Sequence, residues 1–127
     1  MAWNAENYHV MIFGIVGQPT ANHFLPPGVG ATSAAEIQIA PPGACRLVEA
    51  RVICRVAPGG AFVDTYTARV TGVGSACAPT VTAAAVTGTW TGAIDIAEDD
   101  VISIQYTQTG GVATRDPFVT LILRIQE

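Results

Sequence analysis

The chain has 127 residues, a formal net charge of −4, 50% hydrophobic residues and 13% charged residues. This composition excludes an intrinsically disordered chain, which would be polar and highly charged, and the length fits a single domain over residues 1–127. All basic side chains are arginines, so chemistry that needs a lysine is excluded. A nucleic-acid partner is not expected, because there is no basic surplus to displace counterions.

Glycine and proline divide the chain into short segments rich in Val, Ile, Thr and aromatic residues, which favour strands. Residues 8–16 predict a first strand, residues 23–25 a short extended piece and residues 36–40 a second strand. In the first strand both faces are apolar, because Val10 and Ile12 alternate with Met11 and Phe13. An apolar second face predicts either a contact with another subunit or cover by the loop over residues 19–33.

The clearest strand covers residues 45–56. One parity carries Val48, Ala50 and Val52 and is expected to point inward, whereas Leu47, Glu49 and Arg51 share the other parity. Pro58-Gly59-Gly60 then predicts a hairpin to a strand over residues 62–73, in which Tyr66, Ala68 and Val70 share one side.

Residues 80–91, mainly Thr and Ala, predict a less clearly patterned strand that ends at Trp90. Its register is left open because both parities carry small residues. Residues 101–108 alternate cleanly, and the parity of Tyr106 with Ile104 predicts a core position. We expect this strand to pair with a last strand over residues 118–126, whose inward row is Val119, Leu121, Leu123 and Ile125.

Seven or eight strands without a helix predict an all-β fold, an antiparallel two-sheet sandwich of jelly-roll-like form with about eight strands. An immunoglobulin-like sandwich is the alternative, but its cysteine-tryptophan-cysteine spacing is not seen.

The three cysteines, Cys45, Cys54 and Cys77, are an odd number, and no positively charged start precedes the first apolar run. Both features predict reduced thiols and no export signal. That run, residues 10–16, is too short to cross a bilayer, so no membrane partner is expected. Without a C-x-x-C spacing, and with His9 and His23 far apart, no metal or cofactor is expected.

The only acidic cluster, Glu98-Asp99-Asp100, has three interpretations: a solvated turn, a calcium loop, or a carboxylate pair for sugar hydrolysis. The turn is favoured because adjacent side chains on an extended chain point apart. Ser75 lacks a nucleophile elbow and Cys77 has no histidine nearby in sequence. We therefore expect no enzyme and no catalytic residues.

The candidate partner-binding residues are aromatic or apolar: Trp3, Tyr8, Phe118 and Ile122. Trp3 lies in the polar start of the chain, where residues 1–7 are poor strand formers and predict an attachment arm before Tyr8. Phe118 and Ile122 point outward from the last strand and predict a homo-oligomer. Trp90 is a weaker candidate for contact with a glycan.

Residues 97–106, followed by Thr109-Gly110-Gly111 and the final Phe118–Leu123 strand, resemble small jelly-roll proteins of tailed-phage particles. The pieces Phe24–Gly28, Glu36–Ile39 and Cys45-Arg46-Leu47 resemble the entry strands of the same group.

The resemblance implies a non-enzymatic virion protein, assembled in the host cytoplasm, that serves as a head decoration, a head-spike base or a fibre tip. It would bind other virion proteins, such as the major capsid protein or a spike or fibre protein. The alternative is a carbohydrate-binding module that uses Trp90 on a host-surface glycan.

Overall fold

The computed structural model describes residues 8–28, 30–59, 63–109 and 114–125, and these contain strands and no helix. The strands in chain order are β1 (Tyr8–Gly14), β2 (Phe24–Leu25), β3 (Cys45–Ile53), β4 (Val63–Val70), β5 (Val73–Gly74), β6 (Thr80–Thr82), β7 (Thr87–Ile96), β8 (Ile102–Thr109) and β9 (Phe118–Ile125).

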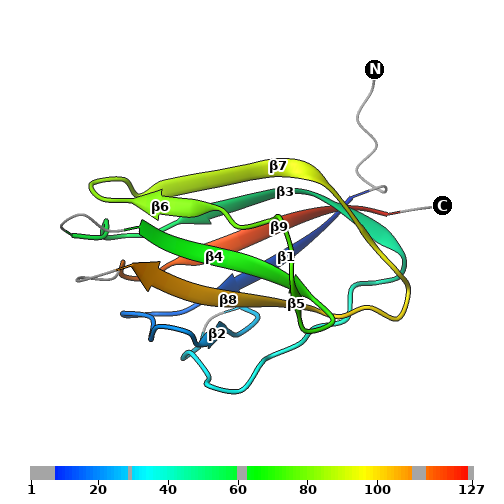
Figure 1. The fold of residues 1–127 in the computed structure, drawn as a ribbon, viewed down its shortest axis with the longest axis horizontal. Coiled ribbons are helices and arrows are strands. Elements are labelled where there is room, and N and C mark those ends of the chain that lie inside the picture. The colour runs from blue at the N-terminus through cyan, green and yellow to red at the C-terminus, as the bar shows by residue number, and fades with distance from the viewer. Residues whose placement is uncertain (1–7, 29, 60–62, 110–113, 126–127) are drawn as a thin grey trace.

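Two antiparallel sheets form the molecule. One has the order β1-β9-β3-β7, and the other has the order β2-β8-β4-β5, with β6 also paired to β4. In Figure 1 the β2-β8-β4 sheet lies in front and the β1-β9-β3-β7 sheet lies behind it. The prediction of an all-β, two-sheet sandwich is confirmed.

The pairing is that of a jelly roll. If the two-residue β5 is set aside, the first strand pairs with the last (β1 with β9), and β2 pairs with β8, β3 with β7 and β4 with β6. These are the nested pairs of one long hairpin. The hairpin is rolled up because β9 also pairs with β3 and β8 also pairs with β4.

The core fills the space between the sheets with side chains of both. Tyr66 and Tyr106 are fully buried in it, with ring centroids 5.3 Å apart. The core position predicted for Tyr106 is confirmed. The inward row of β9 is also as predicted, with Val119, Leu121 and Leu123 fully buried.

A β-bulge changes the parity of β3. Its register against β9 shifts between Leu47 and Glu49, so that Val48 is an extra residue on β3. Cys45 and Leu47 are therefore buried before the bulge, and Ala50 and Val52 after it. The prediction that Leu47 points outward is wrong, because simple alternation does not survive an inserted residue.

Two predicted strand pairings are wrong. The predicted hairpin pairing of β3 with β4 is not formed, because the two strands lie in different sheets and both edges of β3 are occupied by β7 and β9. Likewise, β8 pairs with β4 and β2, whereas β9 lies between β1 and β3. In both cases strands that are close in sequence are assigned to opposite sheets.

Two predicted strands differ from those observed. Residues 36–40 form no strand and make only a single bridge, Ile39 to Ile102, before Pro41 and Pro42, which have no N–H to extend a ladder. Residues 80–91 divide into β6 and the start of β7. Between these strands Ala84 has a φ of 67°, a turn conformation that an extended strand does not contain.

Candidate functional site

The outward side chains of the β1-β9-β3-β7 sheet line up across the strands and form a surface that we call the rear face. Strand register aligns them in four rows across the sheet. In strand order the rows are Tyr8, Arg124, Arg46 and Asp95; Val10, Ile122, Glu49 and Thr91; Ile12, Thr120, Arg51 and Thr89; and Gly14, Phe118, Ile53 and Thr87.

Apolar side chains dominate the β1 and β9 columns of the rear face. Val10 is 51% exposed and pairs with the half-buried Ile122, and Ile12 is 49% exposed and lies one row from both Ile122 and the half-buried Phe118. Ile53 on β3 adds a further side chain that is 59% exposed. Contiguous exposed side chains of this kind mark an interaction surface more often than a solvated one.

Gly14 fits Phe118 onto this face. A Cβ built on Gly14 would lie 2.3 Å from Cδ1 of Phe118, so the ring lies directly over the glycine backbone. This close approach needs a residue without a side chain. The phenyl ring therefore lies across β1 and is half-buried.

Charged side chains are concentrated on the β3 column. Nε of Arg46 lies 2.7 Å from Asp95 Oδ1, and Nε of Arg51 lies 2.9 Å from Glu49 Oε2. Arg51 is 60% exposed and Glu49 is 24% exposed, so the second pair is accessible at the surface. Exposed pairs of this kind stabilise a fold by under about 1 kcal/mol.

The structure brings three of the four predicted partner-binding residues to the rear face: Tyr8, Phe118 and Ile122. Trp3 and the predicted arm over residues 1–7 lie outside the described residues. Sequence reasoning missed Ile53, although its parity with Arg51 on the solvent side was a usable signal.

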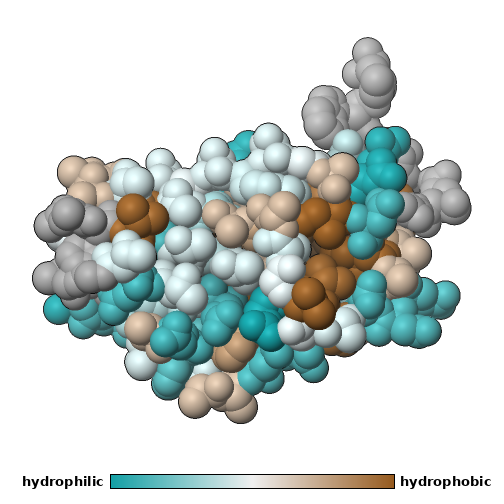
Figure 2. Space-filling model, viewed as in Figure 1, coloured by the Kyte–Doolittle hydropathy of each residue, from teal (hydrophilic) through white to brown (hydrophobic). Residues whose placement is uncertain are grey.

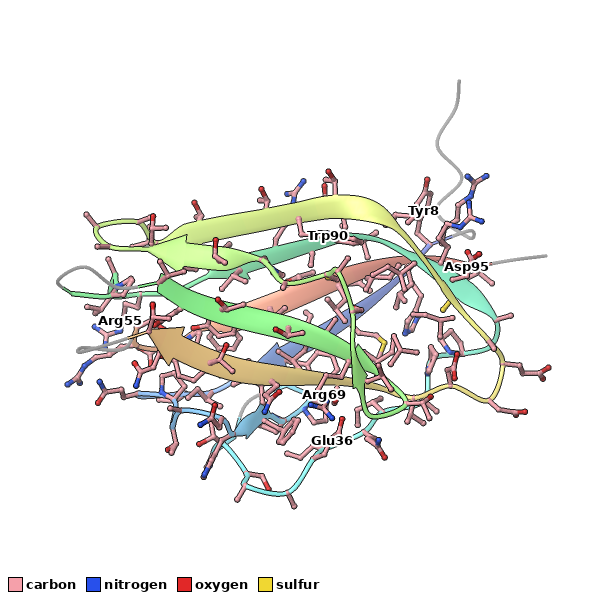
Figure 3. The ribbon with its side chains drawn as sticks, in the orientation of Figure 1. Tyr8, Glu36, Arg55, Arg69, Trp90 and Asp95 are labelled. Atoms are coloured by element: carbon pink, nitrogen blue, oxygen red, sulfur yellow. The ribbon has the colours of Figure 1, made fainter. Side chains whose placement is uncertain are left out.

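Trp90 points to the other side of the same sheet. It lies opposite Ala50 in the β3–β7 register and packs, half-buried, against the core. Figure 3 shows it on β7. Contact with a glycan through Trp90 stays a prediction.

The outward side of the β2-β8-β4 sheet, which we call the front face, is partly covered by its own chain. Glu36, from the segment between β2 and β3, accepts hydrogen bonds from Arg69 Nε, at 3.1 Å, and from the buried Ser103 Oγ. Figure 3 shows Glu36 beside Arg69. Arg69 also donates to Gln105 and lies 5.6 Å from the centroid of the Phe24 ring.

Away from this network the front face is rich in threonine, and Figure 2 shows it as mostly pale or hydrophilic. Brown, apolar atoms gather near β5, where Val73 is 68% exposed. The two sides of the sandwich therefore differ in chemistry.

A buried polar cluster lies at one end of the core, and sequence reasoning did not find it. Oδ2 of the fully buried Asp64 accepts a hydrogen bond from the backbone N–H of Thr114 at 2.9 Å, and the hydroxyls of Thr114 and Tyr66 lie 2.7 Å apart. Burial raises the pKa of Tyr66 well above its usual range. The signal was present, because Asp64 shares the inward parity of Tyr66.

The acidic cluster before β8 is a turn, as the favoured interpretation predicted. Asp100 accepts hydrogen bonds from Thr71 Oγ1 at 2.7 Å and from the Ala97 N–H at 2.9 Å. These bonds lower the pKa of Asp100 below its ordinary value of 3.8. Asp116, just before β9, is held similarly by the Gly17 N–H and by Arg55, which lower its pKa.

Cys45, Cys54 and Cys77 are buried free thiols. Burial raises the pKa of all three, and that of Cys77 reaches about 12. A thiol that stays protonated is a poor nucleophile and a poor metal ligand. Within the described ranges, no three His, Cys, Asp or Glu side chains gather as a metal site would require.

No protein-family model matches this chain, and no curated protein matches it in sequence. Among the described residues, no helix has the length and apolar character needed to cross a membrane.

Proposed function

We propose that this protein is a non-enzymatic structural subunit of a phage-like particle. It self-associates through the rear face and attaches to other virion proteins, such as the major capsid protein or a spike or fibre protein. In the particle it serves as a capsid-surface decoration or as a head-spike or fibre subunit.

The observation that carries this proposal is the apolar half of the rear face. Val10, Ile12 and Ile53 are each about half exposed and lie around Phe118 and Ile122. Fully burying such a side chain contributes about 1.5–3 kcal/mol, so covering its exposed half contributes about half of that, compared with under about 1 kcal/mol for an exposed ion pair. A sheet that exposes this group of apolar side chains is suited to contact with another protein.

Jelly rolls build viral capsid proteins as well as lectins and other domains, so the fold alone does not decide the function. The apolar side chains of the rear face favour a role like that of capsid proteins over that of lectins, because an apolar sheet surface suits contacts with other proteins. The resemblance of residues 97–106 and of the final strand to jelly-roll proteins of tailed phages supports the same assignment.

Two measurements test the proposal. Light scattering over a concentration series should give a mass that is a multiple of the 13.2 kDa chain. An antibody raised against the purified protein should label purified phage-like particles from the source culture. A chain that is monomeric at every concentration would contradict self-association, and absence of label on the particles would contradict the virion role.

A further inference from the structure

The rear face has a different chemistry in each column. The β1 and β9 columns are largely apolar, the β3 column carries Arg46, Glu49 and Arg51, and the β7 column carries Thr87, Thr89 and Thr91. A partner whose columns follow the same order can place apolar side chains on the apolar columns and charged side chains on the charged column. A second copy of this chain has that order.

We propose that the rear face pairs with the rear face of a second copy, about a two-fold axis that runs across the strands. This inference rests on the proposed function and specifies its self-association. Each strand then lies opposite the same strand of the second copy and runs antiparallel to it. The axis passes between the row of Val10 and the row of Ile12.

This axis places complementary groups opposite one another. Val10 faces Ile12 of the second copy, and Glu49 faces Arg51 of the second copy, with each contact made twice by symmetry. In the outer rows, Arg124 faces Phe118 of the second copy, an arrangement in which a guanidinium is attracted to a ring. In the two central rows apolar groups are covered and opposite charges meet, whereas in the outer rows Arg46 faces Ile53 of the second copy.

The other two-fold axis in the plane of the face runs along the strands and gives a poor match. It places β9 opposite β3 of the second copy, so that Ile122 faces Glu49 and Arg124 faces Arg46. A carboxylate would then be covered by an apolar side chain, and like charges would be juxtaposed. Both contacts are unfavourable.

The size of the face is sufficient for a reversible pair. Strands about 4.8 Å apart and rows about 6.8 Å apart give a footprint of roughly 500 Å² on each copy. The two copies together reach about 1,000 Å², the lower end of specific interfaces. The pair is therefore expected to form and separate with concentration.

Charge exchange between Glu49 and Arg51 tests the geometry. Sedimentation equilibrium at low salt should show that Glu49→Arg and Arg51→Glu each weaken self-association at least about tenfold, because like charges then face each other. An equimolar mixture of the two variants should recover wild-type affinity to within about threefold, because positions 49 and 51 are then both arginine in one partner and both glutamate in the other. Thr82→Arg, at an exposed position of the front face, is the matched control and should leave affinity unchanged.

The mixture distinguishes contact between the two copies from loss of the ion pair within one chain. Within one chain Glu49 and Arg51 form an ion pair, which each variant breaks and which mixing does not restore. The double variant Glu49→Arg/Arg51→Glu keeps both charges and should associate like the wild type. Without recovery in the mixture, the two-fold pairing is wrong although self-association stands; a wild-type chain that never associates would instead overturn the proposed function.

Discussion

The two faces of the sandwich differ in how far their apolar side chains are covered by the rest of the chain. On the front face, Phe24 lies under Arg69, and Arg69 is held by Glu36 from a segment of the same chain. On the rear face, Ile122 and Phe118 are half-buried by their strand neighbours, while Val10 and Ile12 stay about half exposed. The chain covers part of one sheet with its own residues and leaves Val10 and Ile12 of the other sheet exposed.

This difference shows that burial in the core and availability for contact can alternate along one strand. On β9, Leu121 points into the core and is fully buried, whereas its neighbour Ile122 points outward. Leu121 therefore contributes to folding, and the next residue is the one that our proposal assigns to association. The comparison of the faces can therefore be tested with substitutions that differ by one position or by one sheet.

The largest expected effect contrasts the two sides of β9. Leu121→Ala removes a fully buried side chain and should lower the free energy of unfolding by about 2–5 kcal/mol. Ile122→Ala should cost less than about 1.5 kcal/mol when the protein is dilute enough to be monomeric, because its site already contacts solvent. Urea denaturation of both variants measures the contrast. Equal losses would mean that the two sides of β9 are packed alike.

A smaller effect contrasts an arginine of each face. Arg69 and Glu36 are 24% and 21% exposed, and Arg69→Met leaves the Glu36 carboxylate without this partner. We expect a loss of about 1–3 kcal/mol. Arg51→Met on the rear face breaks a more exposed pair and should cost under about 1 kcal/mol. If thermal denaturation gave the reverse order, the front face would not depend on its covering segment.

The smallest expected effect is on the stability of the fold at low pH. One aspartate before a strand of each sheet contributes to it. Asp100 before β8 and Asp116 before β9 have lowered pKa values. Their stabilisation is fully present above the ordinary carboxyl pKa of 3.8, and it is lost as the pH falls through the lower pKa of the folded state. Asp100→Asn and Asp116→Asn should each flatten the decline of melting temperature below about pH 4. If the melting temperature of both variants fell with pH as in the wild type, ionisation of these carboxylates would not stabilise the fold.

Local patterns predicted the strands that keep one parity from end to end. Alternation placed Tyr106 and Leu121 in the core, and both are fully buried. It failed at Leu47, because the bulge at Val48 resets the parity of β3. Which strands pair was beyond the sequence pattern, since rolling the chain into a jelly roll joins β1 to β9 across nearly the whole length.

The candidate site was predictable in part for the same reason. Phe118 and Ile122 were found from the alternation of a regular strand, and the structure places both on the rear face. Parity with Arg51 indicated that Ile53 points outward, but its place beside Phe118 follows only from the pairing of β3 with β9. The cover of the front face by Glu36 could not be anticipated, because it depends on a contact between residues 33 positions apart.

The most direct test of the account is the mass of Ile122→Asp, measured by light scattering beside Thr82→Asp as the matched front-face control. Both variants add one carboxylate to an outward strand position, but only the first places it in the apolar part of the rear face. If the protein assembles through the rear face, Ile122→Asp should be a monomer of 13.2 kDa and Thr82→Asp should keep the wild-type multiple. A wild-type mass for a folded Ile122→Asp would contradict the assignment of the rear face as the surface through which this protein assembles.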